Sequence, residues 1–516
     1  MHIFTALSSL LIVVDAGRPR PQHDELNIST TSGRVHGKID RHLPNVRQFL
    51  GIPFAQPPVE ELRWAAPQPL SQPHKHIEAT KLPPSCPQSL TETGTDVYTQ
   101  DVLEFNLQGL NKTGSISEDC LTLSVWTPTQ EKCSQKSKKQ SKKGLPVLVY
   151  VYGGSFSTGG QDVPYQIPAQ WVDRAPDHIV VSFNYRVNVF GFPGAEGLDD
   201  QNVGLLDQRL AVEWVQKNIA QFGGDPEKIV IWGQSAGAAS VDFYNFAYPE
   251  DPIVTGLIMD SGTTYTGTIS LPGDATGANF SYVASQVGCP DLADTPEQQL
   301  ACMRKVDFRI IESFVANYSD SGTQPRLAFQ PSVDDKVVFS NYTQQALEGK
   351  QAKIPAIIGT NAQDGVPFAP YRVEGPDQAA ANAALLTAFV CPATETTRLR
   401  QETKRTTYRF FYAGNFTNIS PRPWMGAWHS AELPLIFGTH PNYRGPSTKL
   451  EYATSHAMQD AWVAFATDPV NGLSAQDWLP YDTLGSATVR EFGAGVAARD
   501  VDIASLEAQC NGPVPG

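Results

Sequence analysis

A serine between two glycines is the feature of this sequence that points most directly to chemistry. The pattern G-x-S-x-G is matched by Gly233-Gln234-Ser235-Ala236-Gly237, which directly follows the apolar run Lys228–Trp232. In such a turn a strand bends sharply into a helix, and larger side chains at the glycines would collide with one or the other. The bend exposes the hydroxyl of Ser235 and leaves the next backbone N–H free to stabilise an oxyanion. This setting predicts that Ser235 is a nucleophile.

A serine nucleophile needs a base, and the base needs a carboxylate to orient it. Where the nucleophile sits on this kind of turn, the chain order is serine, acid, histidine. A carboxylate in the right place is Asp364, which follows the strand-like run Pro355–Ile358. Only three of the ten histidines come later in the chain, namely His429, His440 and His456. The order therefore reduces the candidates for the base to these three.

The surroundings of the three histidines differ. His456 lies in a helical pattern and is interpreted as an ordinary helix residue, whereas His440 lies in a loop rich in Gly and Pro. His429 is flanked by small and aromatic residues that would let an imidazole reach a pocket. Chain order alone does not separate His429 from His440.

A glycine-rich segment earlier in the chain is a candidate second wall for an oxyanion site. Residues 147–160 read VLVYVYGGSFSTGG, and Gly153 and Gly154 would allow backbone N–H groups to face a developing negative charge. The alternative is an ordinary glycine turn. No metal-binding cluster or dinucleotide motif accompanies these residues, so the sequence implies no cofactor.

Short apolar runs alternate with helical patterns around these candidate residues. Ile179–Phe183, Lys228–Trp232, Gly256–Met259 and Pro355–Ile358 read as buried strands, and Gly204–Phe222 reads as a helix. Strands separated by helices favour an α/β fold with a mostly parallel sheet that helices cover on both faces.

Composition excludes several classes of protein. With 18% charged and 41% hydrophobic residues, the chain is too apolar for disorder and too polar for a protein that spans a membrane many times. Its net charge of −14 would repel phosphate backbones, which argues against nucleic acid as a partner. The Lys-rich segment 131–143 lies between the strand-like runs Leu121–Trp126 and Leu145–Tyr152. We interpret it as the solvated tip of a long hairpin, the alternative being a contact with an anionic surface.

The N-terminus and the sequons predict secretion. The apolar run 3–14 is too short to span a bilayer and suits a signal peptide over residues 1–16, which leaves a single domain over 17–516. The alternative is a disordered or buried N-terminus. No hydrophobic tail follows Cys510, so no membrane anchor is expected. An extracellular glycoprotein is also favoured by seven sequons, at Asn27, Asn111, Asn279, Asn317, Asn341, Asn415 and Asn418.

Two longer segments make the sequence recognisable. They are FGGDPEKIVIWGQSAG at Phe222–Gly237 and EDCLTLSV at Glu118–Val125, and the segments FLGIPFAQPP, GLLDQRLAVEWVQKNI and NYRV accompany them. On these residues the chain resembles the type-B carboxylesterase/lipase family, which includes fungal lipases and cholinesterases. The resemblance runs from about residue 25 to residue 510 and implies an α/β-hydrolase fold.

The resemblance also assigns roles to residues. It implies a triad of Ser235, Asp364 and His429, with oxyanion donors from the amides of Gly154, Ser155 and Ala236. This chain departs from the family pattern in two places. Asp364 stands where the family usually has Glu, and Ser155 replaces the third glycine of the oxyanion loop.

The seven cysteines fit a secreted enzyme with a few disulfides. The resemblance implies the pairs Cys86–Cys120, Cys289–Cys302 and Cys391–Cys510, which leave Cys133 over in the Lys-rich segment. We interpret Cys133 as an unpaired loop cysteine, the alternative being a reactive or intermolecular thiol. The resemblance further implies two structural ion pairs, Arg63 with Glu118 and Arg186 with Asp207.

These residues predict a carboxylic ester hydrolase that works through an acyl-enzyme and acts on small-molecule esters. We expect neutral, apolar esters, because the Cys86–Cys120 loop holds none of the nine tryptophans and so lacks the ring that binds choline in cholinesterases. The apolar residues of that loop fit either a flap, which would make the protein an interfacial lipase, or core packing. A non-catalytic binding module of the same family is the remaining alternative.

Overall fold

The structure is a computed structural model, and it describes residues 25–88, 97–102, 116–130, 144–266, 274, 276–289, 295–442, 444–482 and 488–510. Several predictions fall outside the described residues. They are the signal peptide over 1–16, the sequon at Asn111, the free Cys133 and the Lys-rich segment 131–143.

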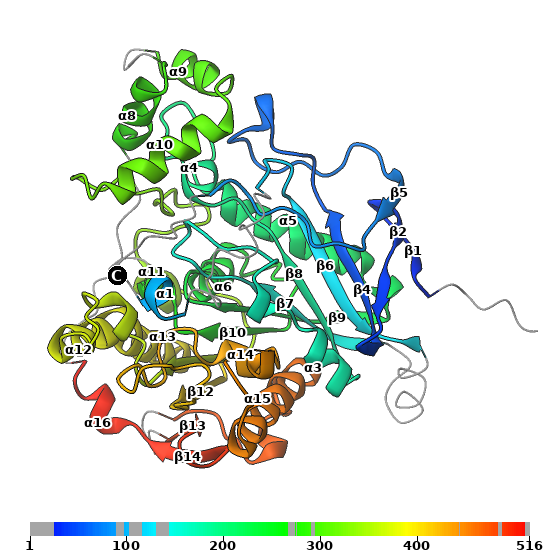
Figure 1. The fold of residues 1–516 in the computed structure, drawn as a ribbon, viewed down its shortest axis with the longest axis vertical. Coiled ribbons are helices and arrows are strands. Elements are labelled where there is room, and N and C mark those ends of the chain that lie inside the picture. The colour runs from blue at the N-terminus through cyan, green and yellow to red at the C-terminus, as the bar shows by residue number, and fades with distance from the viewer. Residues whose placement is uncertain are drawn as a thin grey trace, which may run out of the picture.

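A sheet of eleven strands crosses the described part of the molecule (Figure 1). Its strand order is β14-β13-β12-β11-β10-β9-β7-β8-β6-β4-β3, and a separate small sheet has the order β1-β2-β5. Parallel pairings join β8, β7, β9, β10, β11, β12 and β13, which confirms the predicted α/β class. The strands are β1 Asn27–Thr30, β2 Gly33–His36, β3 Lys38–Asp40, β4 Leu43–Pro53, β5 His74–Glu78, β6 Thr122–Pro128, β7 Leu145–Val151, β8 Ile179–Phe183, β9 Gly224–Gln234, β10 Gly256–Asp260, β11 Ala356–Asn361, β12 Thr407–Tyr412, β13 Thr488–Phe492 and β14 Ala498–Asp502.

Helices lie on both faces of this sheet, with α5 and α6 on one face and α14 and α15 on the other (Figure 1). The helices are α1 Val97–Gln100, α3 Ala169–Arg174, α4 Asn188–Gly191, α5 Val203–Asn218, α6 Ala236–Ala247, α8 Ala278–Gln286, α9 Pro296–Met303, α10 Phe308–Asp320, α11 Tyr342–Leu347, α12 Gln378–Leu385, α13 Cys391–Glu402, α14 Leu433–Ile436, α15 Lys449–Thr467 and α16 Ala504–Glu507. No helix within the described ranges is both long enough and apolar enough to cross a bilayer.

The strand and helix predictions agree closely with these bounds. Ile179–Phe183 is β8 without any change of limits, and Lys228–Trp232 lies inside the longer β9. The predicted helix Gly204–Phe222 is α5 followed by a 3₁₀ turn over Ile219–Phe222.

The predicted hairpin between β6 and β7 is wrong. Strand β8 lies between these two strands and pairs antiparallel with β6 and parallel with β7. The chain runs from β7 through α3 into the parallel β8, and this strand takes the place beside β6 that the hairpin would have closed. The Lys-rich segment therefore connects two strands that are not neighbours.

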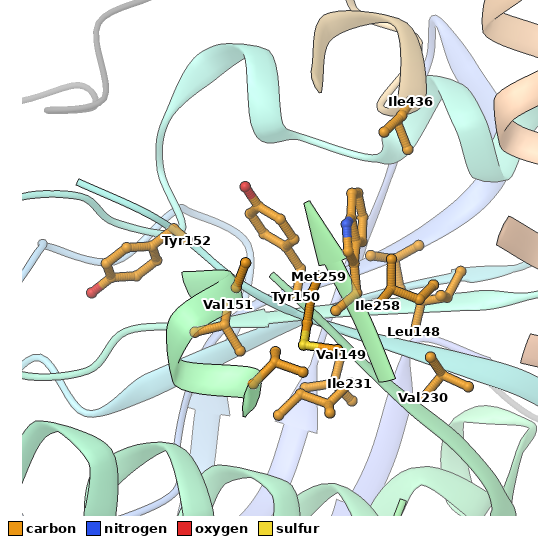
Figure 2. Packing of buried hydrophobic residues seen from close by; sticks show 14 of the residues in the cluster. Leu148, Val149, Tyr150, Val151, Tyr152, Val230, Ile231, Ile258, Met259 and Ile436 are labelled. Carbon is orange, nitrogen blue, oxygen red and sulfur yellow. The ribbon is translucent and has the colours of Figure 1, made fainter. Parts of the chain in front are cut away.

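The core is built from strands whose side chains alternate between the two faces of the sheet. Figure 2 shows Leu148 to Val151 of β7 packed among residues of β9 and β10. On one face, the ring of Tyr150 lies 4.5 Å from Trp232 and 4.9 Å from Phe437, which directly follows α14. This dense aromatic packing fixes the ends of β7 and β9, where the candidate residues are found.

A second apolar cluster lies outside the sheet and holds α8, α9 and α10 (Figure 1). The implied disulfide Cys289–Cys302 is present here. The buried Arg63 donates two hydrogen bonds to Glu118, of 2.6 and 2.7 Å, and a third of 3.0 Å to the carbonyl of Met303 at the end of α9. Because a buried charge needs such partners, this ion pair fastens the helical cluster to the main body.

The other implied covalent and ionic links are also present. The Cys86–Cys120 bond closes the loop that contains α1, and Cys391–Cys510 joins the start of α13 to the last described residue. Arg186 and Asp207 form a buried bidentate pair, with contacts of 2.9 and 2.7 Å. These two disulfides and this ion pair are therefore interpreted as structural.

Candidate active site

The turn that carries Ser235 joins the end of β9 to the start of α6. Ser235 has φ 58° and ψ −125°, a strained conformation for a residue with a side chain. A Cβ atom on Gly233 would lie 2.2 Å from the carbonyl oxygen of Gly237, and one on Gly237 would lie 2.1 Å from that of Val151. Only glycine fits at either position, as the G-x-S-x-G pattern predicts. The side chain of Ser235 is left half-buried among fully buried neighbours.

Asp364 lies just beyond the end of β11 and is completely buried. Its Oδ1 is 2.8 Å from Nδ1 of His429. Its Oδ2 accepts hydrogen bonds from the hydroxyl of Ser261, at 2.8 Å, and from the backbone N–H of Asn361, at 2.7 Å. These donors hold the carboxylate in one orientation toward the imidazole.

His429 belongs to the long connection between β12 and α14, and two residues near β11 anchor this connection. Gln363 forms two hydrogen bonds with Ala427, one through its backbone N–H at 3.0 Å and one through its side-chain oxygen at 2.7 Å. The amide nitrogen of Asn361 donates to the carbonyl of Trp428 at 3.0 Å. Through these contacts the structure brings His429 beside Asp364.

The second nitrogen of His429, Nε2, lies 3.2 Å from the amide nitrogen of Gln234 in the serine turn. If Gln234 donates here, Nε2 presents its lone pair and Nδ1 carries the proton toward Asp364, which is the tautomer of a neutral general base. Among the described residues, no hydrogen bond joins His429 to the hydroxyl of Ser235, which lies next to Gln234 in the chain.

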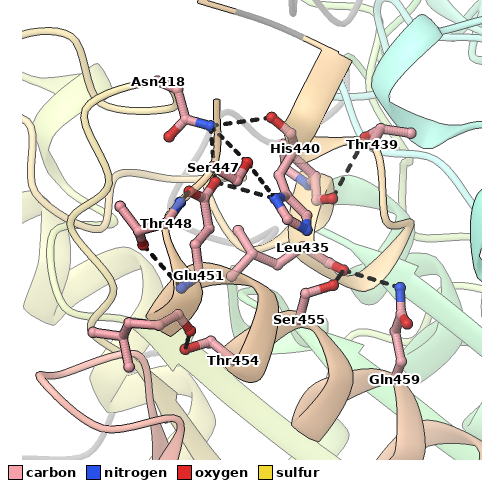
Figure 3. A network of polar contacts seen from close by, with 12 residues as sticks. Asn418, Leu435, Thr439, His440, Ser447, Thr448, Glu451, Thr454, Ser455 and Gln459 are labelled. Atoms are coloured by element: carbon pink, nitrogen blue, oxygen red, sulfur yellow. Dashed lines mark hydrogen bonds and ion pairs between the residues drawn. The ribbon is translucent and has the colours of Figure 1, made fainter. Parts of the chain in front are cut away.

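The other two histidines lie in different surroundings. His440 is buried, and its Nδ1 is 2.7 Å from the hydroxyl of Ser447 and 3.3 Å from a carboxylate oxygen of Glu451 (Figure 3). Glu451 also completes the capping box at the start of α15. His456 lies on an exposed face of the same helix. Of the three candidates, only His429 contacts Asp364.

The network around His440 also bears on glycosylation. The amide nitrogen of Asn418, the atom that would carry a glycan, is buried and donates to the carbonyl of His440 at 3.0 Å, to Ser447 at 3.2 Å and to Glu451 at 2.9 Å (Figure 3). Its surroundings therefore differ from those of the other described sequons. Asn317, Asn341 and Asn415 are exposed, and Asn27 and Asn279 are half-buried.

In the glycine-rich loop and at the start of α6, a hydrogen-bonded carbonyl sets the direction of the next backbone N–H group. The carbonyl of Gly154 accepts from the N–H groups of Ser157 and Thr158, at 2.9 and 3.0 Å, and the N–H of Ser155 points the opposite way across the same trans peptide. In α6 the carbonyl of Ser235 accepts from the helix at 2.9 Å, and the N–H of Ala236 therefore faces back out of the helix. Within the described ranges, the N–H groups of Gly154, Ser155 and Ala236 make no hydrogen bond.

Ser235, Ser155 and Ala236 line one cavity of about 660 Å³. One part of its wall is aromatic, with Phe368 and Phe389, whose rings lie 5.2 and 4.7 Å from the imidazole of His429. Another part comes from the end of α10 and the segment after it and is rich in polar side chains. A cavity of this size that mixes aromatic and polar walls suits a small organic molecule.

Comparisons with known proteins show which family this chain belongs to. The sequence model described as "Carboxylesterase family" matches residues 24–388 and 377–495. The chain belongs to the carboxylesterase family. This membership, with the sheet described above, makes the protein an α/β hydrolase and a carboxylic ester hydrolase.

Curated members of the carboxylesterase family align over most of the chain. A chlorogenic acid esterase of Aspergillus niger is 48% identical over 87% of this chain and 83% of its own length. Secreted lipase 5 of Gibberella zeae is 40% identical, with coverage of 93% and 92%. A cholinesterase of Mus musculus is 30% identical, with coverage of 89% and 81%.

The structure of this carboxylesterase adds residues that the sequence reasoning missed. Ser261 follows β10 at the same edge of the sheet as Ser235 and Asp364, a position that chain order along the sheet could have indicated. Two further carboxyl groups, Asp260 and Glu432, are fully buried behind the histidine. Trp232 donates to Asp260 at 2.5 Å, and Asn361 donates to Glu432. No local sequence pattern marks them, because their burial depends on the assembled sheet.

Burial raises the pKa of Glu432 well above its usual value, and the nearby Asp260 and Asp364 raise it further. The pKa of Asp260 is also raised well above its usual value, first by burial and then by Asp364. Neutral forms of these two acids avoid a concentration of negative charge next to the Asp364 carboxylate.

Glu432→Gln is therefore expected to make the stability of the protein less dependent on pH. The unfolded chain loses this proton near the ordinary glutamate pKa of 4.5, whereas the raised pKa lets the folded protein keep it to higher pH. The folded form thus binds more protons, and the free energy of unfolding falls as pH rises through this window. Thermal unfolding at about pH 5 and about pH 8 should show a smaller decrease in Tm for Glu432→Gln than for the wild type. Glu374→Gln, which changes an exposed glutamate, serves as the control. Equal decreases in Tm in all three proteins would contradict a raised pKa of Glu432.

Proposed function

We propose that this protein is a secreted serine esterase in which Ser235, His429 and Asp364 form the catalytic triad. The observation that carries the proposal is the 2.8 Å contact between Asp364 and His429 beside the cavity that Ser235 lines. His429 takes the proton of Ser235 as the hydroxyl attacks the ester carbonyl, and Asp364 stabilises the imidazolium that forms. The side chain of Asp364 is one methylene shorter than that of the Glu that is usual in the family.

The tetrahedral oxyanion is held by the N–H groups of Gly154, Ser155 and Ala236, which have no other acceptor among the described residues. Gln330 supports the glycine-rich loop that contains Gly154 and Ser155, because its amide nitrogen donates to the carbonyl of Ser155 at 2.8 Å. His429 then gives its proton to the leaving alcohol, and water hydrolyses the acyl-enzyme by the same steps in reverse order. The mechanism requires the Ser235 hydroxyl to take the place of Gln234 at Nε2 when substrate binds.

We further propose a mature, extracellular enzyme of one domain over residues 17–516, after removal of a signal peptide over 1–16. The three disulfides support an oxidising compartment, and the alignment to a relative named Secreted lipase 5 over 93% of the chain supports secretion. Glycans are proposed at the exposed sequons.

The proposed substrates are esters with an apolar or aromatic group and without a positive charge. Phe368 and Phe389 beside His429 supply an apolar wall for one half of the ester. The only charged side chain among the described lining residues is the cationic Arg326, which would repel a choline group. Two of the relatives are named as a chlorogenic acid esterase and a lipase, and these names fit esters without a quaternary ammonium group better than choline esters.

Hydrolysis rates over a panel of esters test this substrate class. We expect turnover of 4-nitrophenyl butyrate and of chlorogenic acid. Butyrylcholine should have a kcat/KM at least about tenfold below that of its neutral isostere, 3,3-dimethylbutyl butyrate, which corresponds to about 1.4 kcal/mol of charge repulsion. A choline ester hydrolysed faster than the neutral isostere would contradict the proposal. Tributyrin tests the lipase alternative, because an interfacial lipase gains rate above the solubility limit of its substrate and a plain esterase does not.

A further inference from the structure

The part of the cavity wall that comes from the segment after α10 carries a positive charge. Among the described residues that line the cavity, Arg326 is the only charged one. It lies in the segment after α10, and neutral polar residues such as Ser319, Thr323 and Gln324 line the same cavity. Because the whole chain has a net charge of −14, a lone cation on this wall creates a local field of the opposite sign.

Arg326 has no partner among the residues that the structure describes. Other arginines in the same region are engaged, since Arg63 pairs with Glu118, Arg304 with Glu61 and Arg309 with Asp307. By contrast, the exposed guanidinium of Arg326 forms no ion pair or hydrogen bond with any residue that the structure describes. Its five N–H donors are available to a ligand in the cavity.

The position of Arg326 relative to the proposed oxyanion site is set by Gln330. Gln330 binds the carbonyl of Ser155, so the segment 326–330 lies against the oxyanion loop. Arg326 and Gln330 are four positions apart in the chain, which limits the distance between their Cα atoms to about 14 Å. A substrate that extends from Ser235 past the oxyanion loop therefore comes within reach of the guanidinium.

We propose that Arg326 binds a carboxylate of the substrate and that the enzyme prefers esters that carry one away from the scissile bond. The inference rests on the proposed function and narrows its substrate class. A planar guanidinium matches a carboxylate with two parallel hydrogen bonds, which gives this residue a geometric preference for that group. The carboxylate can belong to the alcohol half or the acyl half of the ester, and the test below separates the two cases.

Two pairs of esters that differ in charge test the proposal. Chlorogenic acid and its methyl ester differ in a carboxylate on the alcohol half, and mono-4-nitrophenyl succinate and 4-nitrophenyl butyrate differ in one on the acyl half. For at least one pair, the wild type is expected to favour the charged ester in kcat/KM by about tenfold at low salt. This preference should decrease as ionic strength rises from about 10 mM to about 500 mM.

Variants of two arginines locate the source of the preference. Arg326→Gln should bring the ratio of kcat/KM for the charged ester to kcat/KM for the neutral ester of the affected pair close to one. Arg326→Lys should keep part of this preference, since a point charge remains. Arg309→Gln, which removes an exposed arginine outside the cavity lining, should keep the full ratio. An Arg326→Gln enzyme that retains the wild-type ratio for both pairs would overturn the proposal.

A binding measurement keeps this test independent of turnover. Calorimetry with chlorogenic acid and its methyl ester is done on Ser235→Ala, with and without Arg326→Gln. Tighter binding of the acid that disappears with Arg326→Gln supports the carboxylate site, even if the proposed catalytic roles are wrong. Equal Kd values for acid and methyl ester in Ser235→Ala would contradict the site, while hydrolysis by the wild type would still support the esterase.

Discussion

Ser235→Ala is expected to lower ester hydrolysis by about ten-thousandfold or more while the protein stays folded. The substitution removes one half-buried oxygen that lines the cavity, and it leaves no buried space behind it. Alanine bears the same positive φ of 58° that serine bears, so the turn itself is not further strained. The measurement is kcat with 4-nitrophenyl butyrate, accompanied by circular dichroism and Tm.

A matched control is Ser319→Ala, which removes a hydroxyl from the wall of the same cavity. This variant should hydrolyse 4-nitrophenyl butyrate at nearly the wild-type rate. Purified Ser235→Ala that keeps even about a tenth of wild-type activity would exclude the serine mechanism, because the loss of a nucleophile is far larger than that.

His429→Ala is expected to have a similar effect, because without the imidazole no group in contact with Asp364 can take the proton of the serine. Asp364 keeps its hydrogen bonds to Ser261 and Asn361, so the carboxylate stays oriented and the fold is retained. The measurement is again kcat, with Tm recorded for the same preparations.

The other two histidines provide the controls. His456→Ala changes an exposed helix residue and should leave both kcat and Tm close to wild type. His440→Ala breaks the buried contacts with Ser447 and Glu451, so it should lower Tm while the folded fraction keeps most of its kcat. A folded but inactive His440→Ala would show that the wrong histidine has been assigned as the base.

Local rules predict the shape of the serine turn and name a candidate for the acid. Gly233 and Gly237 are required by contacts within a strand, a turn and a helix that are close in sequence, so the pattern itself carries the geometry. Asp364 is a candidate because of the chain order serine, acid, histidine and because it follows a strand-like run, and the structure places it just beyond β11. The family resemblance then added the oxyanion residues and the disulfide pairs.

Tertiary contacts decided what the sequence left open. His429 and His440 both follow β12, and chain order does not separate them. The anchoring of the chain before His429 by Gln363 and Asn361 places this histidine, and not His440, beside Asp364. The hairpin prediction was wrong for the same reason, since a later strand occupies the place beside β6. The contact between Gln234 and His429 likewise joins residues from distant parts of the chain, which no spacing within the motif reveals.

The bond between Cys391 and Cys510 determines what a protease can remove from this enzyme. It closes a loop with a sequence separation of 119, and His429 lies inside that loop, whereas Ser235 and Asp364 precede it. A single cut anywhere from residue 392 to residue 509 leaves both fragments covalently joined, so the histidine stays tethered to the part of the chain that carries the serine and the acid. In the medium outside a cell, where proteases are common and thiols are scarce, a nicked molecule of this kind remains one molecule until a reductant opens that one bond.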